Sequence, residues 1–354
     1  MVNHFTQRGT KVLLAAWLST VCTGAVWSAP IGHALDRPAV ISKRATQSVL
    51  LGIAQAGQRF VAVGERGIVL VSEDDVGQWR QVPTPVSVTL TAVRFANDKV
   101  GYAVGHSGTV IVTADGGQTW TRSLDGRQIV KIGLAAAQAS GDTTDMQEAE
   151  RMANDGPDKP LLDLLVIDDK RVIVIGAYGM AFATTDGGKT WSSWNSRLQN
   201  RRGLHLYAIR SQGNRILICG EQGLVRLSTD GGQSFSALKT PYEGSFFTAE
   251  LLSENHIVLA GLRGNVLRSA DDGLNWKKVA SPDAASITGS TQRADGSLVL
   301  VSQAGLILAE ERGALVAINK SPLPSLTGIF SKRHGSFLAL STQGVLSTSI
   351  GETK

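Results

Sequence analysis

Five aspartates recur in this sequence with a spacing that could position carboxylates for chemistry. Each follows a glycine by seven residues and precedes an aromatic residue by five. The pairs are Asp74 with Trp79, Asp115 with Trp120, Asp186 with Trp191, Asp230 with Phe235 and Asp271 with Trp276. Acidic neighbours such as Asp271 and Asp272 could bind calcium. In a tight turn the carboxylate can instead accept backbone N–H bonds while adjacent glycines take positive φ, so we favour turn capping over a metal site.

Two further patterns suggest a cofactor or a metal, and both fail on inspection. Gly187-Gly188-Lys189-Thr190 is similar to the end of a phosphate-binding loop, but Ala183 stands where that loop requires its first glycine. The six histidines have no metal-ligand spacing to one another or to a cysteine. The sequence therefore predicts no cofactor and no metal.

The aspartates belong to a repeat that must position them. Gly305 and Gly344 continue the series after the aspartate and the aromatic residue are lost, which gives seven copies at intervals of 41, 71, 44, 41, 41 and 39 residues. This period is typical of one four-stranded propeller blade per copy. Residues 90–95 and 109–113 alternate as strands do. The sequence predicts an all-β fold, a seven-bladed β-propeller.

The last copy has room for only one strand after Gly344. Residues 37–44 lie upstream of the first blade and have no other evident partner. We expect them to pair with the last blade as an N-terminal strand that closes the ring and covers its open edges. Removal of residues 38–43 should then cost several kcal/mol of stability.

The N-terminus has the pattern of a signal peptide. Arg8 and Lys11 precede an apolar run over residues 12–26, and small residues follow up to a cleavage point near Ala34. We expect residues 1–34 to be removed and the mature chain, residues 35–354, to be periplasmic. Membrane anchoring through the same run is the alternative, but the run is short for a spanning helix.

The mature chain offers little charge or thiol chemistry. Cys219 would be its only cysteine, so no internal disulfide can form, and its apolar neighbours indicate a buried, inert thiol. The net charge of about +3 is too weak to argue for nucleic acid. We expect a protein that is monomeric by itself and does not insert into a membrane after cleavage.

One interval contains an insertion of about 30 residues, at about 125–160. Residues 143–154 carry a helix-start residue and good helix formers. The insertion is either a tolerated surface loop or a docking element, since long ordered loops often carry function.

The repeat resembles the Asp-box, or BNR, repeat. The matching segments are Thr113 to Trp120, Thr185 to Trp191 in a one-residue variant, Ser228 to Phe235 and Ser269 to Trp276. The combination of Gly-x-x-Gly with Asp-Gly-Gly-x-Thr-Trp resembles the photosystem II assembly factor-like propellers. Residues 156–160 and 204–208 are similar to a branch from non-photosynthetic bacteria that is often encoded beside RND-type exporters. The resemblance implies an exported, non-enzymatic scaffold for a membrane-associated complex.

Enzymes with the same repeat are the competing class. Sialidases need three arginines that converge on a carboxylate and a Tyr/Glu nucleophile pair. Tyr242 and Glu243 are adjacent, and four arginines, Arg37, Arg66, Arg202 and Arg263, are available. Adjacency in sequence does not establish that geometry. We predict no enzyme. A sialidase-like glycoside hydrolase, or a carbohydrate-binding propeller with Tyr178 and Tyr242 in its central pocket, is the alternative.

Partner binding is expected on the face where the Gly-x-x-Gly turns and the links between blades emerge. That assignment follows the usual strand path of a propeller blade in the family. Arginine and tyrosine are favoured in protein interfaces. The candidate partner-binding residues are Arg66, His106, Tyr178, Arg197, Arg201, Arg202, Tyr242 and Arg263.

Overall fold

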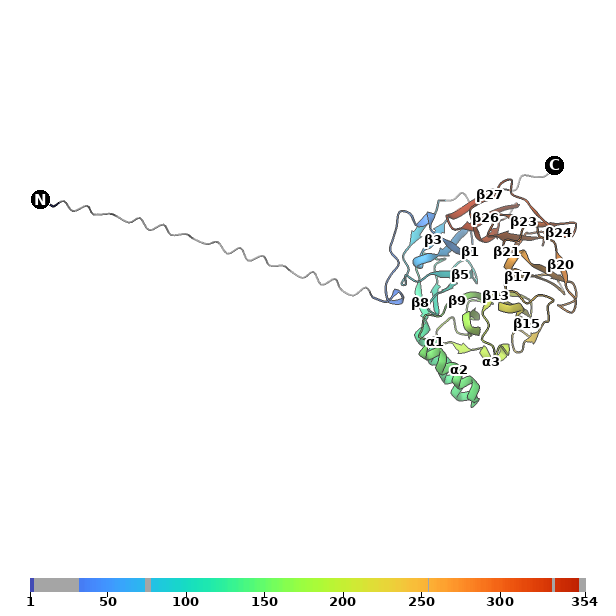
Figure 1. Cartoon of the computed structure of the whole chain (residues 1–354), viewed down its shortest axis with the longest axis horizontal. Helices are drawn as coiled ribbons and strands as arrows, with labels where there is room; N and C mark the ends of the chain where they lie inside the picture. The colour runs from blue at the N-terminus through green and yellow to red at the C-terminus, as the bar shows by residue number, and fades with distance from the viewer. Residues whose placement is uncertain (3–31, 74–77, 254, 333–334, 350–354) are drawn as a thin grey trace. The chain divides into compact units, whose positions relative to one another are not determined.

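The computed structural model describes residues 1–2, 32–73, 78–253, 255–332 and 335–349. The described residues from His33 onward form one compact unit, a ring of seven antiparallel sheets (Figure 1). The predicted seven-bladed β-propeller is thereby confirmed. Most of the predicted signal peptide lies outside the described residues, so its cleavage stays a prediction. Within the described ranges, no helix is long and apolar enough to cross a membrane.

The strands follow one another along the chain and along each sheet. Blades 1 to 4 are β1 (Leu50–Ala56), β2 (Arg59–Gly64), β3 (Val69–Ser72) and β4 (Arg80–Val82); β5 (Leu90–Phe95), β6 (Gly101–Gly105), β7 (Thr109–Thr113) and β8 (Thr121–Leu124); β9 (Leu161–Val166), β10 (Val172–Gly176), β11 (Ala181–Thr184) and β12 (Ser192–Ser193); and β13 (Leu206–Gln212), β14 (Arg215–Gly220), β15 (Val225–Ser228) and β16 (Ser236–Ala237). Blades 5 to 7 are β17 (Phe246–Ser253), β18 (His256–Gly261), β19 (Val266–Ser269) and β20 (Lys277–Val279); β21 (Ile287–Gln292), β22 (Leu298–Ser302), β23 (Ile307–Glu311) and β24 (Ala314–Ala317); and β25 (Leu326–Ser331), β26 (Ser336–Ser341) and β27 (Gly344–Ser349). The helices are η1 (Ala34–Asp36), η2 (Ala45–Gln47), η3 (Glu65–Gly67), η4 (Ala177–Gly179), η5 (Glu221–Gly223), η6 (Leu262–Gly264), α1 (Gly126–Ser140), α2 (Thr143–Asn154) and α3 (Asn195–Leu198).

The core lies between the blades. The first strand of each blade packs against the first strand of the next, and β25 packs against β1. Each gap holds buried apolar side chains from both of its walls; Val61 of β2 and Val93 of β5, for example, belong to one cluster. Both faces of every sheet are therefore buried, as the repeat requires.

The predicted N-terminal strand does not form. Residues 37–44 contain no strand, and their backbone binds blade 1, where the Gln81 side chain accepts from the Ser42 N–H at 2.8 Å and donates to the Val40 carbonyl at 3.0 Å. The reason lies just upstream. Leu35 is fully buried and Asp36 binds Arg127 of α1 at 2.6 Å, so the chain is held against blades 1 and 2 before it reaches the last blade.

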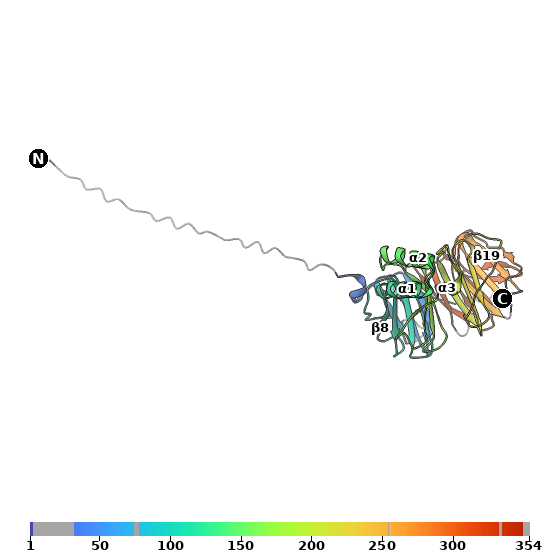
Figure 2. The same ribbon diagram turned by 90° about the horizontal axis from the view of Figure 1, so that it is seen from below.

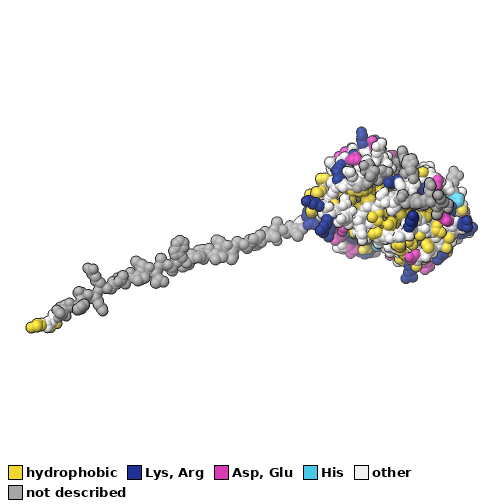
Figure 3. Space-filling view, turned by 90° about the horizontal axis from the view of Figure 1, so that it is seen from above, with side chains coloured by type: hydrophobic (Ala, Val, Ile, Leu, Met, Phe, Trp, Pro, Cys, Tyr) yellow, Lys and Arg dark blue, Asp and Glu magenta, His cyan; other side chains and the backbone are white. Residues whose placement is uncertain are grey.

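The ring closes instead by direct packing of blade 7 on blade 1. The Thr327 hydroxyl of β25 donates to the Leu50 carbonyl of β1, and the rings of Phe60 and Phe330 meet edge to face with centroids 5.7 Å apart. Among the described residues, the seventh sheet has three strands, so no strand pairs with the outer edge of β27. At the start of β27, η2 packs against it, and a Cβ on Gly344 would lie 2.0 Å from the Thr46 carbonyl. Val345 of β27 is only half-buried. Figure 3 views the molecule from above the top of Figure 1, where β27 is labelled. It shows many hydrophobic side chains on that side of the ring.

The insertion between blades 2 and 3 contains two helices. The Asp125 carboxylate caps α1 in a capping box with Gln128, and Asp142 caps α2. Between the helices, Gly141 has φ 68°, which favours glycine and ends α1. The helix predicted at residues 143–154 is present as α2, whereas α1 was not predicted. Figure 2, an edge-on view, shows both helices toward one face of the ring.

Candidate functional site

The recurring aspartates are hydrogen-bonded within their own turns. Oδ1 of Asp115 accepts from the backbone N–H groups of Gln118 and Thr119, each at 3.0 Å, and Oδ2 accepts from the Thr119 hydroxyl at 2.6 Å. The Thr113 hydroxyl donates to Asp115 at 2.8 Å and accepts from the Gly117 N–H at 3.0 Å. Closely similar sets surround Asp186, Asp230 and Asp271. Asp74 lies outside the described residues.

These bonds also hold the turn carboxylates in their ionised form. The Thr190 hydroxyl and backbone N–H, with the Thr184 hydroxyl, lower the pKa of Asp186 to about 2. The corresponding hydrogen bonds lower the pKa values of Asp230 and Asp271. Such carboxylates are turn caps and cannot serve as general acids near neutral pH. In the part of the chain that the structure describes, no cluster of His, Cys, Asp or Glu could hold a metal ion.

The aromatic residues of the repeat pack between blades. Trp120 is 6% exposed, lies in the cluster between blades 1 and 2, and donates from Nε1 to the Gly117 carbonyl at 3.0 Å. Phe235 is equally buried against blade 3. Trp79, Trp191 and Trp276 are half-buried. These side chains stabilise the ring.

The Gly-x-x-Gly turns and the links between blades share one face, which we call the turn face. The carbonyl of Val86, in the link after β4, lies so near Gly67 that a Cβ there would be 2.1 Å away. In blade 2, the Gly108 N–H donates to the Lys159 carbonyl, and the Gly126 N–H donates to the Ser107 carbonyl, each at 2.8 Å. Both ends of the helical insertion therefore start from the turn face, as the sequence predicted.

The turns of blades 1 to 5 hold a residue other than glycine in the left-handed conformation. These residues are Arg66 (φ 54°), Ser107 (φ 55°), Tyr178 (φ 56°), Gln222 (φ 50°) and Arg263 (φ 56°). All but Ser107 are exposed. A non-glycine residue in this region stores about 1–3 kcal/mol of strain, and such positions cluster at functional sites.

An aromatic row crosses the turn face over blades 3 to 5, and the sequence did not predict it. The ring centroids of Tyr178 and His205 are 5.0 Å apart, those of His205 and Tyr207 6.1 Å, and those of Tyr207 and Phe247 5.2 Å. Nδ1 of His205 accepts from the Tyr178 backbone N–H at 3.1 Å. The Lys159 ammonium lies 5.7 Å from the centroid of the Tyr178 ring. These rings form a continuous surface of large, rigid side chains.

The paired arginines lie between this row and the insertion. Arg201 and Arg202 are both exposed, and the Arg202 guanidinium donates to the Gln222 side chain. Arg201 is close enough to help lower the pKa of Asp142, at the start of α2, although the hydrogen bonds of the cap are the larger cause. The link that carries Arg201 and Arg202, the turn that carries Gln222 and the start of α2 at Asp142 are thus close together.

The remaining predicted residues differ in their surroundings. His106 is exposed on the turn face. The Tyr242 hydroxyl donates to the Leu262 carbonyl at 3.0 Å, so Tyr242 is tied to the turn of blade 5. Arg197 does not join the group, because it stacks on Trp194 at 4.4 Å and donates to the Gly232 carbonyl, in the aspartate turn of blade 4.

The middle of the ring contains a chain of charges that was also missed. Asp163 of β9 binds Arg210 at 2.6 Å and Arg94 at 3.4 Å, and Arg210 lies 3.8 Å from Glu250. The Gln292 side chain donates to Glu250 at 3.0 Å. Burial lowers the pKa of Arg94. Burial also opposes the charge of Arg210, but the two carboxylates outweigh it and raise the pKa of that guanidinium. These pairs join the first strands of blades 2 to 6.

Fold and site together define a seven-bladed β-propeller that presents loops of several blades, aromatic side chains and a helical insertion on one face. The chain belongs to the family described as photosynthesis system II assembly factor YCF48, whose model matches residues 71–146 and 147–310. None of the curated protein sequences matches the chain significantly.

Solved structures with the same fold include two described as YCF48. "YCF48 bound to D1 peptide" is 15% identical, with a TM-score of 0.65 over 89% of this chain and 97% of that chain. "YCF48 from Cyanidioschyzon merolae" is 14% identical, with a TM-score of 0.62 over 85% and 95%. An enzyme also matches: the GH74 protein of Niastella koreensis is 15% identical, with a TM-score of 0.59 over 87% of this chain and 44% of that chain. At these identities the likeness shows the fold alone.

Proposed function

We propose that this protein is an exported, non-catalytic scaffold that binds a protein segment of a membrane-associated complex on its turn face. The observation that carries the proposal is the aromatic row from Tyr178 to Phe247, which lies beside the paired arginines and α2. Tyrosine and arginine anchors that are rigid before binding lose little entropy when a partner docks.

Membership in an assembly-factor family supports this proposal, and one solved relative, a YCF48 protein, is bound to a D1 peptide. The finer part is that the complex is an RND-type exporter in the bacterial envelope and that the chain reaches the periplasm through its signal peptide. That part rests on the resemblance and the N-terminal pattern described above.

The contacts of Tyr242 weigh against glycoside hydrolysis. Its hydroxyl is hydrogen-bonded to a backbone carbonyl and its ring packs on Phe246 at 5.5 Å, so it is not positioned with Glu243 as a nucleophile pair. The carbohydrate-binding alternative also loses support, because Tyr178 packs on His205 rather than facing Tyr242 across a shared pocket. A glycosidase screen of the purified protein provides the direct check.

The proposal is tested by capture of membrane proteins on immobilised full-length protein. Replacing Arg201 and Arg202 together with Ala, or excising residues 141–154, should abolish most of the capture and leave the melting temperature nearly unchanged. The matched control replaces Arg171 and Lys189, two exposed cations in turns on the opposite side of blade 3, with Ala. Capture that survives both turn-face changes but is lost in the control would overturn the assignment.

A further inference from the structure

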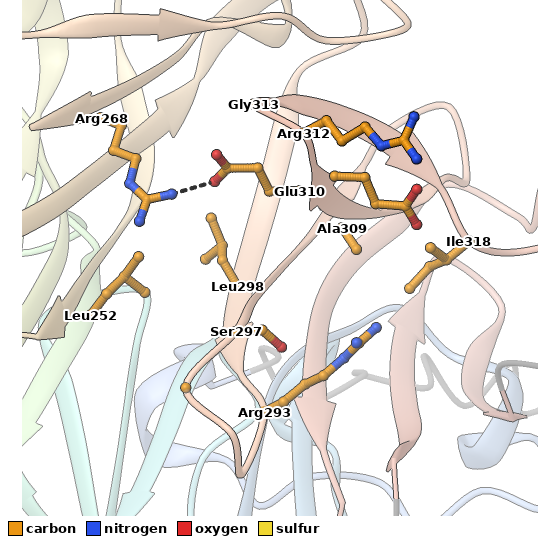
Figure 4. Close-up of a pocket in the computed structure, with 12 residues that line it drawn as sticks. Leu252, Arg268, Arg293, Ser297, Leu298, Ala309, Glu310, Arg312, Gly313 and Ile318 are labelled. Atoms are coloured by element: carbon orange, nitrogen blue, oxygen red, sulfur yellow. Dashed lines mark hydrogen bonds and ion pairs between the residues drawn. The ribbon is translucent and has the colours of Figure 1, made fainter. Parts of the chain in front are cut away.

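The sixth blade lacks the aspartate turn, and a cavity stands in its place. In blades 2 to 5, the residue after the aspartate donates its N–H to the turn between the first two strands of the same blade. These bonds join Gly116 to Lys99, Gly187 to Lys170, Gly231 to Asn214 and Asp272 to Asn255, at 2.8 to 3.0 Å. In blade 6, only Arg312 and Gly313 connect β23 to β24. No turn crosses the blade end, and a cavity of about 440 Å³ is left open (Figure 4).

Two cations that line this cavity, Arg293 and Arg312, have no salt bridge among the described residues, although the Asp295 carboxylate in the same turn as Arg293 interacts with it electrostatically. Arg268 is neutralised by Glu310 at 2.7 Å, as the dashed line in Figure 4 shows. Arg293, at the end of β21, lies 5.6 Å from the centroid of the Phe337 ring, and its Nε is buried without a hydrogen-bond partner. A buried guanidinium donor without an acceptor is costly unless a ligand supplies one. In Figure 4, Arg293 and Arg312 lie on opposite sides of the open space.

The residues that line the cavity determine which kind of ligand it can bind. A guanidinium binds carboxylate and phosphate through its planar fork. Glu311 also lines the cavity, and it repels a doubly charged phosphate more than a singly charged carboxylate. Leu252, Leu298 and Ile318 supply apolar walls that suit a short hydrocarbon stem. We propose that this cavity binds a carboxylate on a short aliphatic stem, with Arg293 as its ion partner.

Such a group can come from a glutamate side chain of a peptide or from a free short-chain carboxylic acid. The two sources share the chemistry that Arg293 recognises and differ in the chain that follows the stem. The cavity lies on the side of the ring opposite the turn face, among the turns that carry the repeat aspartates in other blades. This proposal is therefore independent of docking on the turn face. Its failure would leave the proposed function untouched.

Isothermal titration of the full-length protein tests the site with two probe pairs. They are acetyl-Ala-Glu-Ala-amide against its Gln counterpart, and pentanoate against pentanamide. We expect at least one charged probe to bind and its uncharged partner not to bind; which charged probe binds identifies the source. Arg293→Gln should weaken that binding by about 10- to 100-fold, since one charge-assisted interaction is lost. Dissociation constants weaker than about 10 mM for both charged probes would overturn the proposal.

Two further variants keep the test decisive. Arg171→Gln removes an exposed arginine from the corresponding turn of blade 3, where it pairs with Asp168 at 2.7 Å, and should leave binding unchanged. Glu311→Gln removes the repelling carboxylate and should tighten binding of the charged probe, which provides an answer even if Arg293→Gln does not fold. Binding that persists in Arg293→Gln, or that fails to tighten in Glu311→Gln, contradicts the assignment.

Discussion

Replacing Asp163 with Asn should cost about 2–4 kcal/mol of folding free energy. Its carboxylate accepts from the backbone N–H groups of Leu164 at 2.9 Å and Ile209 at 3.1 Å, and from the guanidinium groups of Arg210 at 2.6 Å and Arg94 at 3.4 Å. Removing one partner of a buried ion pair typically costs about 3–5 kcal/mol. We lower this range because the Arg210 and Arg94 side chains are 21% and 36% exposed, so water can partly solvate them.

Urea unfolding followed by tryptophan fluorescence measures this loss, with the m-value used to check that the transition stays comparable. The matched control is Asp36→Asn, which breaks an ion pair with Arg127 whose two side chains are 43% and 45% exposed. Exposed pairs contribute little, so the control should shift the midpoint far less. A loss below about 1 kcal/mol in Asp163→Asn, or one no larger than in Asp36→Asn, would show that the central charges do not hold the blades together.

Four further outcomes are expected. Trp120→Ala should cost about 3–5 kcal/mol in urea unfolding because it empties a closed gap, whereas the half-buried Trp276→Ala should cost about 1–2 kcal/mol; equal losses would contradict the burial argument. The folded-state pKa of Asp186 is lowered to about 2, so the contribution of its carboxylate to stability is complete above the unfolded pKa of about 4 and is lost as the pH falls toward 2. The melting temperature of Asp186→Asn should therefore depend less steeply on pH in that window. Burial raises the pKa of Cys219 to about 12, so iodoacetamide should label it only after unfolding, and rapid labelling of the folded protein would refute its burial. Deleting residues 38–43 should cost only about 1–3 kcal/mol, because the segment makes three hydrogen bonds to the region of blade 1. A larger loss, a substantial fraction of the total stability, would restore the strand predicted from the sequence.

The repeat was readable from the sequence because its turns demand particular residue types. A glycine at positive φ and an aspartate that caps its own turn have few substitutes, so their spacing reports the blades directly. The closing strand was not predictable in the same way. Any short β-prone segment can be imagined against an open edge, whereas the contacts that direct residues 37–44 elsewhere join Asp36 to Arg127, 91 positions away.

The candidate site was predictable only in its single residues. Tyr178 was expected on the turn face, but its row with His205 and Tyr207 depends on contacts between blades that no local pattern encodes. The central charges did leave a trace in the sequence. Arg94 and Arg210 each stand four residues after the first apolar residue of a blade's inner strand, as Glu250 does in blade 5. Aligning the copies on those apolar residues would have revealed these three, but not Asp163, which stands two residues after Leu161, or Gln292, which stands five after Ile287.

The left-handed turns separate the residues that the fold requires from those that it leaves free to vary. In blade 1, Gly64 and Gly67 are fixed because a Cβ on either would lie 2.1 Å from a backbone carbonyl. The left-handed residue directly before the second glycine is nevertheless Arg, Ser, Tyr or Gln in one blade or another, with φ between 50° and 56°. A single substitution at such a position changes the side chain that the turn presents and leaves the backbone of the blade unchanged. The ring thus has a constant frame with exchangeable side chains at its turns, and under the proposed function a change at one turn would alter partner binding one blade at a time.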